Sequence, residues 1–408
     1  TNRDVASPFL VEVQESAVKP IEPVFLDYQK DMSQLKAKSD IPILYKQNVA
    51  NDLFQLIYVF DMGNNHDKAL GTAFDYLEYL GTSDMTPEEL KSEFYRLACT
   101  FYVSPGNERT YVVLSGLNEN MPAAVQLFEK LLADAQVNKE AYTNMTSDIL
   151  KARSDAKLNQ GQNFSRLMSF AMYGPKSPAT NLLTEAELTN MNPQELVDRI
   201  HNQNSYKHRI LYYGPSSSKD LLATINQYHQ VPAALKDIPA GNEYSYLETP
   251  VTKVLVAPYD AKQIYMAQIS NLDKKYDPAI EPIRALYDEY FGGGMNSIVF
   301  QEMRETRGLA YSAWASIMPP SYLKYPYVLR TQIATQNDKM IDAVTTFNDI
   351  INNMPESEAA FKLAKDGLTN RLRTERIIKG DIIWSYINAQ DLGQNVDPRI
   401  KLYNDIQN

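Results

Sequence analysis

The sequence of 408 residues has a single cysteine, which excludes an internal disulfide framework and any metal centre built from several thiolates. It has no run of about 18 apolar residues, so we expect no membrane span. Basic residues are outnumbered by acidic ones, 40 against 50, and the net charge of -10 gives no support for a nucleic-acid-binding surface. We therefore expect neither a membrane nor nucleic acid as a partner.

Histidine is also scarce, and the motifs of hydrolytic enzymes are missing. No His-Glu-x-x-His, His-x-x-Glu-His or Gly-x-Ser-x-Gly occurs. His201 and His208 are seven residues apart, but no acidic residue stands beside them at a metal-site spacing, so we expect both to face solvent. Cys99 lies at an apolar helix end without a nearby histidine, which predicts a buried structural thiol rather than a nucleophile.

What the sequence does contain is an ordinary folded composition, with 44% hydrophobic and 22% charged residues. Its length favours two or three domains. The first residue is Thr1 rather than Met, so we expect a processed product or a shortened piece of a longer protein. The composition leaves the compartment open between cytoplasm and periplasm.

Three segments with different patterns divide the chain. Residues 1–42 contain several prolines and few periodic apolar positions, which predicts a linker or strap rather than a core element. One α+β domain is predicted for residues 43–235 and a second for residues 245–408. Between them, Pro232 and Pro239 lie in a stretch without a convincing period, which is typical of a domain boundary.

The two domains are predicted to repeat one order of elements. The second is expected to contain strands at 253–258, 264–270, 309–317 and 327–335, and helices at 280–291, 295–306, 338–353 and 357–379. We therefore expect a duplicated α+β unit, each copy an antiparallel sheet with helices packed on one face. The first copy closes with a strand beginning at Arg209, whereas the second reaches Asn408 without one, so we expect the natural chain to continue further.

Three consecutive glycines, Gly292, Gly293 and Gly294, precede a predicted helix, where backbone N–H groups can bind an anion. A phosphate-binding loop would continue with Lys-Ser or Lys-Thr, but Met295 and Asn296 follow here. The favoured interpretation is a sharp turn that lets two helices pack closely, with anion binding as the alternative.

The segment from 291 to 313 is the most distinctive in the chain. It reads Phe-Gly-Gly-Gly-Met-Asn-Ser-Ile-Val-Phe-Gln-Glu-Met-Arg-Glu-Thr-Arg-Gly-Leu-Ala-Tyr-Ser-Ala. This closely resembles the sequence typical of the second, non-metal half of the pitrilysin/insulinase family of inverted-motif zinc peptidases. The repeated order of elements agrees with that family, so the resemblance covers residues from about 45 to 408.

The resemblance implies a clamshell of two similar halves, each made of two α+β domains. In the family, the active half carries His-x-x-Glu-His and a distal Glu that bind zinc. In this chain, Phe74 stands at the first His position, and Leu77 and Glu78 stand at the Glu and second His positions. Two ring nitrogens and the general base are missing, so we expect this chain to bind no zinc, and the zinc to lie in the partner half.

The resemblance also implies a pair of residues that contact the substrate. Family members place an Arg and a Tyr seven residues apart, where they reach a peptide at the zinc, and here these are Arg304 and Tyr311. An Arg offers forked donors to a carbonyl or carboxylate, and a phenol can donate to a developing oxyanion. The structural alternative is that Arg304 pairs with Glu305 or Glu302 and that Tyr311 packs in the sheet.

The leading hypothesis is that this chain is the catalytically inert half of a zinc metallopeptidase, which encloses and positions a peptide substrate. Its partner is then the catalytic half, on the same polypeptide or in a separate subunit. The alternative is a free-standing subunit or scaffold of the same fold that binds a protein partner without cleaving anything. By itself, the chain is predicted to be inactive.

Overall fold

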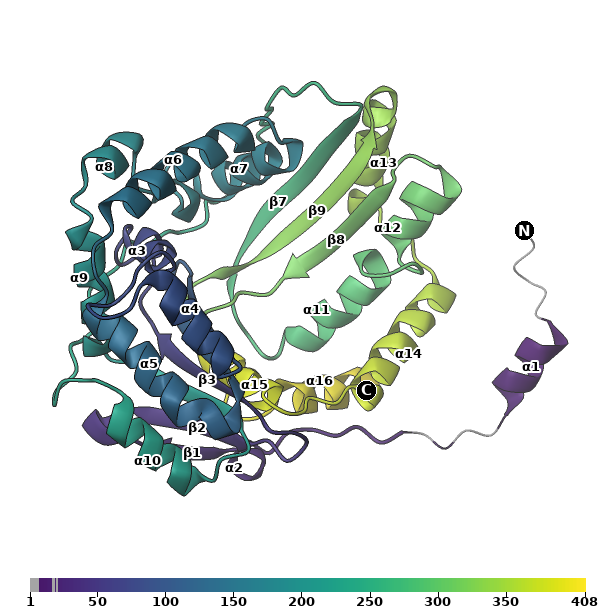
Figure 1. The fold of residues 1–408 in the computed structure, drawn as a ribbon. Coiled ribbons are helices and arrows are strands. Elements are labelled where there is room, and N and C mark those ends of the chain that lie inside the picture. Colours follow the sequence, from purple (N-terminus) through teal and green to yellow (C-terminus); the bar gives the residue numbers. More distant parts are fainter. Residues whose placement is uncertain (1–6, 17–18, 20) are drawn as a thin grey trace.

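The computed structural model describes residues 7–16, 19 and 21–408, which form two β-sheets with their helices (Figure 1). The predicted strap at 1–42 is described only in part, since residues 1–6, 17–18 and 20 lie outside the described residues. The described part of this segment contains helices α1 (Pro8–Glu15) and α2 (Tyr28–Asp31), strand β1 (Ser33–Lys36) and the short turn η1 (Lys38–Asp40).

The first sheet has six strands in the order β1-β2-β6-β3-β5-β4. Beyond β1, its strands are β2 (Pro42–Gln47), β3 (Leu53–Phe60), β4 (Cys99–Pro105), β5 (Thr110–Leu117) and β6 (Arg209–Gly214). All neighbours pair antiparallel except β2 and β6, which are parallel, with Ile43 opposite Ile210. This one departure from the predicted antiparallel pattern arises because β6 returns after a long helical excursion, the kind of crossover that parallel pairing needs.

The helices that follow the strands of the first sheet are α3 (Leu70–Leu77), α4 (Pro87–Arg96), α5 (Met121–Asp134), α6 (Lys139–Ala156), α7 (Gln160–Tyr173), α8 (Glu185–Asn190), α9 (Gln194–Asn202) and α10 (Ser218–Tyr228), with short turns η2 (Asn118–Asn120), η3 (Pro178–Thr180) and η4 (Gln203–Ser205). Of these, α3, α5, α9 and α10 contribute buried side chains to the core on one face of the sheet. The largest core lies at this face, where Phe60 and Tyr212 of the sheet and Phe128 of α5 are fully buried. Burying such aromatic side chains supplies much of the hydrophobic stabilisation of the domain.

The opposite face of the first sheet is covered by segments from the two ends of the chain. Ile57 and Leu211 of the sheet share a core with Tyr28 of α2 and with Ile383 of α15 (Asp381–Asp391). Helix α15 comes late in the sequence but packs under the first sheet, as Figure 1 shows. The first sheet is therefore buried on both faces, which corrects the prediction of helices on one face only, because α2 and α15 come from distant parts of the chain to cover the second face.

The second sheet has three antiparallel strands in the order β7-β9-β8. Its elements are β7 (Gln263–Lys275), α11 (Glu281–Tyr287), η5 (Asp288–Gly292), α12 (Ile298–Phe300), η6 (Gln301–Thr306), β8 (Ser312–Met318), β9 (Pro326–Gln336), η7 (Asn337–Lys339), α13 (Met340–Asn352), α14 (Glu358–Thr374) and α16 (Pro398–Gln407). Phe291, Val299 and Phe347 of the helical layer pack with Ala315 and Ile333 of the sheet. The α+β class predicted from the sequence is thus confirmed.

One predicted strand is not formed. Residues 253–258 have no regular structure, and Val254 and Val256 are 83% and 76% exposed. In the first sheet, β6 lies between β2 and β3, whereas no described strand takes the place of β6 beside β7. The predicted strand at 253–258 is therefore wrong, because a strand forms only where a neighbouring strand satisfies its backbone groups.

Helix α7, which lies in the first domain of the sequence, packs against the second sheet. The ring of Phe164 in α7 lies 5.6 Å from the ring of Tyr265 in β7, and Nε2 of Gln160 donates to the carbonyl oxygen of Gln263 at 2.7 Å. Among the described residues, no helix combines the length and apolar character that crossing a bilayer requires.

Candidate functional site

The distinctive segment folds into η5, α12, η6 and the start of β8, and it brings Arg304 and Tyr311 together. Arg304 lies in η6, and Tyr311 directly precedes β8. Between them, Gly308 adopts a positive φ of 57°, which glycine tolerates without steric cost. The N–H of Tyr311 donates to the carbonyl oxygen of Ala334 at 3.0 Å, so β9 fixes the position of this residue.

The guanidinium of Arg304 lies between two aromatic rings. Its carbon Cζ is 5.1 Å from the ring centre of Phe300 and 5.9 Å from that of Tyr311, both within cation–π range. The Arg304 side chain is about half exposed, and its Nε is 4.0 Å from the nearest carboxylate oxygen of Glu305. Glu302 contacts Arg307 instead, with 3.4 Å between Nε and Oε2. The aromatic rings thus orient a cation that solvent can still reach.

Tyr311 does not pack in the sheet, because 76% of its surface is exposed. Its phenol and the Arg304 guanidinium together offer hydrogen-bond donors at the surface. Such a pair can bind a carbonyl, a carboxylate or an oxyanion of a ligand.

The glycine triplet serves close packing at its first position. A Cβ added to Gly292 would lie 2.0 Å from the carbonyl oxygen of Ala315 in β8, so only glycine fits there. At Gly294, in contrast, an added Cβ would meet nothing within 4 Å. The geometry at Gly292 therefore agrees with the turn-and-packing interpretation of this motif.

The positions where the zinc motif would stand lie in and just after α3. Phe74 and Leu77 are buried in the core of the first domain, and Glu78 is exposed at the C-terminal cap of the helix. The two buried side chains are hydrocarbons with no donor atom for zinc, so these residues do not fit the ion. In the described part of the chain, no three His, Cys, Asp or Glu side chains are arranged to hold a metal.

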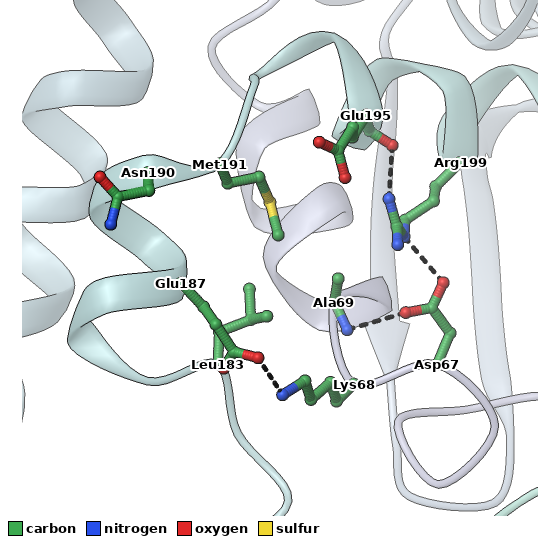
Figure 2. Close-up of a pocket in the computed structure, with 9 residues that line it drawn as sticks. All are labelled: Asp67, Lys68, Ala69, Leu183, Glu187, Asn190, Met191, Glu195 and Arg199. Carbon is green, nitrogen blue, oxygen red and sulfur yellow. Dashed lines mark hydrogen bonds and ion pairs between the residues drawn. The ribbon is translucent and has the colours of Figure 1, made fainter.

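A pocket of about 340 Å³ lies between the loop before α3 and helices α8 and α9 (Figure 2). It is lined by Asp67, Lys68, Ala69, Leu183, Glu187, Asn190, Met191, Glu195 and Arg199. The Arg199 Nε is 2.7 Å from Oδ2 of Asp67, and Lys68 forms an ion pair with Glu187. The sequence did not predict this pocket, because its residues come from three elements up to 132 positions apart.

A buried polar chain lies inside the first domain. Nε2 of His208 is 2.8 Å from Nε2 of His229, and Nδ1 of His229 is 2.6 Å from Oε1 of Glu129 in α5. Nδ1 of His208 must carry a proton, because it lies 2.7 Å from the carbonyl oxygen of Tyr206, which can only accept. Burial and the neighbouring His229 lower the pKa of His208 to about 3, so its unprotonated Nε2 accepts a hydrogen bond from the Nε2–H of His229.

The expectation that His208 faces solvent is therefore wrong, whereas His201 is exposed as predicted. His208 is not on a helix but directly precedes β6, and its partners come from α5 and the end of α10. A sequence spacing of seven residues carries no information on contacts of this range. Cys99 is buried, as predicted.

The chain is similar to known proteins in sequence. Residues 210–368 match the family model described as the peptidase M16 inactive domain. A protein from Rickettsia felis named as an uncharacterized zinc protease is 20% identical over 263 residues, which span 61% of this chain and 60% of that protein. The chain thus matches less than two thirds of that relative's length.

Solved structures share the fold. The peptidase M16 inactive domain from Pseudomonas fluorescens has a TM-score of 0.64 and 17% identity, over 91% of this chain and 88% of that one. The periplasmic protease PqqL from Escherichia coli has a TM-score of 0.71 and 13% identity, over 99% of this chain but only 48% of that one. Similar folds thus occur both in chains of comparable length and in chains about twice as long.

Proposed function

We propose that this chain, whose residues 210–368 match the peptidase M16 inactive domain, is the non-catalytic half of a zinc peptidase of the pitrilysin and insulinase type. In this role it closes over a catalytic half, encloses a peptide substrate and positions it for cleavage. The zinc ion and the general base belong to the catalytic half, which is either part of the same polypeptide or a separate subunit.

The observation that carries this proposal is the arrangement of Arg304 and Tyr311. Both are solvent-accessible, and their backbones are fixed by η6 and by the contact of Tyr311 with β9. The Arg304 guanidinium is oriented to hold a peptide carbonyl through two donors, and the Tyr311 phenol to donate to the oxyanion that forms when water attacks the scissile bond. A positioned donor pair costs little reorganisation when the substrate arrives.

The positions of the lost zinc motif support a non-catalytic role. Phe74 and Leu77 contribute hydrocarbon to the core of the first domain. Restoring ligands there would place polar or charged groups in an apolar core, which is unfavourable without partners. The cleavage chemistry therefore has to come from the other half.

Reconstitution with the catalytic half tests the proposal. Residues 1–408 are co-expressed with a catalytic half, and hydrolysis of an internally quenched fluorescent peptide is measured for the complex and for each half alone. We expect cleavage by the complex, none by this chain alone, and loss of activity when a chelator removes zinc.

Two results would contradict this function. The first is a catalytic half whose kcat/KM is unchanged by adding this chain. The second is a stable complex of the two halves that never cleaves a peptide, which is the result expected of a scaffold.

A further inference from the structure

The pocket between the loop before α3 and helices α8 and α9 contains one carboxylate more than it contains cations. Asp67, Glu187 and Glu195 face it together with Lys68 and Arg199. Arg199 is paired with Asp67, and Lys68 with Glu187. In the described part of the chain, nothing forms a hydrogen bond or ion pair with the carboxylate of Glu195, and Figure 2 shows it between Met191 and Arg199. One negative charge in the pocket is therefore unmatched.

Further hydrogen bonds hold the two ion pairs in place, so each of these four charges already has a partner of opposite sign. Nη1 of Arg199 donates to the backbone oxygen of Glu195 at 2.7 Å, and Asp67 also accepts from the N–H of Ala69 at 3.0 Å. Glu187 accepts from the N–H of Thr184 at 2.8 Å, and its contacts with Lys68 and Thr184 lower its pKa to about 2. A charged ligand would therefore meet Glu195 as its counter-ion.

Apolar groups line the pocket beside that carboxylate. Leu183 and Ala69 are buried, and Met191 is half-buried with a flexible thioether side chain that adapts to different shapes. A pocket of about 340 Å³ is large enough for one side chain, since sites for whole small molecules occupy about 300–1,000 Å³. The lining thus combines one free carboxylate with a surface for an aliphatic stem.

We propose that this pocket binds a lysine or arginine side chain of a peptide. The charged head lies against Glu195, and the aliphatic stem packs on Met191 and Leu183, as long cationic side chains do on apolar surfaces. The source of the ligand, a peptide, rests on the proposed function. The charge and shape of the pocket do not depend on it.

Direct binding to residues 1–408 tests this inference without the catalytic half. The probes are a fluorescein-labelled pentapeptide, Gly-Ala-Arg-Ala-Gly, and the same peptide with citrulline in place of arginine, which keeps the shape but removes the charge. Fluorescence anisotropy should show about tenfold weaker binding of the citrulline peptide, the loss expected for one charge-assisted hydrogen bond. Free arginine amide should compete only weakly.

Variants of the chain locate the site. Glu195→Gln should weaken binding of the arginine peptide about tenfold and leave the citrulline peptide unaffected. Glu185→Gln is the matched control. Glu185 is an exposed residue of α8 that lies outside the pocket lining, and its substitution removes the same charge. Circular dichroism and melting temperature should show that both variants are folded.

Three outcomes would overturn the inference. They are equal affinity for the arginine and citrulline peptides, equal losses for the two variants, and arginine amide binding as tightly as the peptide, which would indicate a site for small cations. If one of these outcomes is found but the complex with the catalytic half still cleaves peptides, this inference fails and the proposed function stands.

Discussion

The guanidinium of Arg109 and the carboxylate of Asp391 form two parallel hydrogen bonds, each 2.6 Å long, across 282 positions of sequence. Arg109 precedes β5, and Asp391 ends α15. Nε of Arg109 also contacts Asp61, and Cζ lies 5.3 Å from the ring centre of Tyr322 in the β8–β9 loop. One side chain thus joins the first sheet to the helix beneath it and to the second sheet's loop.

Arg109→Lys is expected to destabilise the protein by about 1–3 kcal/mol, because a lysine cannot form both parallel bonds in this largely buried site. The free energy of unfolding is measured by urea denaturation. Arg96→Lys is the control: its ion pair with Glu93 is exposed to solvent, so the change in the free energy of unfolding should be much smaller. Equal effects of the two substitutions would argue against the joining role of Arg109.

The buried His208 makes stability depend on pH. Its pKa of about 3 in the folded state lies below the ordinary value of 6.5, so between these values the unfolded chain binds a proton that the folded chain does not. The contribution of His208 to the free energy of unfolding is therefore complete above pH 6.5 and declines as pH falls, by up to about 1.4 kcal/mol per pH unit.

His208→Asn should flatten this dependence, whereas the exposed His201→Asn should leave it as in the parent. Urea denaturation between pH 4 and 8 measures the slope for all three proteins. Parallel curves for the parent and His208→Asn would show that this histidine does not cause the effect.

The close approach of Gly292 to β8 predicts a sensitive position in the second domain. Gly292→Ala should lower the free energy of unfolding by about 1–3 kcal/mol. The added Cβ would overlap the carbonyl oxygen of Ala315 and force the backbone to shift. Gly294→Ala, where the space is open, should be neutral or slightly stabilising. Thermal denaturation compares the two, and a Gly292→Ala protein as stable as the parent would contradict the packing assignment.

The proposed roles of Arg304 and Tyr311 predict that their substitution changes different kinetic constants. In the complex with the catalytic half, Tyr311→Phe should lower kcat about a hundredfold with a smaller effect on KM, because the lost hydrogen bond is made chiefly to developing negative charge. Arg304→Ala should impair both kcat and KM, because its forked donors also hold the bound peptide. Steady-state rates with a quenched fluorescent peptide measure both effects.

The neighbouring Arg307→Ala removes the same charge and is the control for Arg304→Ala. Because Tyr311 is exposed, Tyr311→Phe should melt at the same temperature as the parent protein. An unchanged kcat in this well-folded variant would exclude the phenol as a transition-state donor.

The sequence predicted those features that depend on short stretches of chain. The helices and strands around the distinctive segment were placed within a few residues, and Arg304 and Tyr311 lie together because one turn connects η6 to β8. Local patterns sufficed there, since periodicity and glycine positions determine such a turn.

Features built from distant residues could not be predicted. The buried chain from Glu129 to His229 and His208 joins three elements, and α15 packs beneath a sheet formed by a much earlier part of the sequence. At 253–258 the apolar pattern led to the prediction of a strand that is not formed, because no described strand pairs with this segment. Tertiary partners decide such cases, and a single sequence does not identify them.

The outer edge of β7 has a consequence for how this chain behaves at high concentration. This strand of 13 residues pairs with β9 on one side only, among the described strands, and Val254 and Val256 add exposed apolar surface in the segment before it. Open strand edges are templates on which other chains add by backbone hydrogen bonding. The isolated chain should therefore self-associate in a concentration-dependent way, and a lysine at Val256 should suppress this association as charged residues do on natural edge strands.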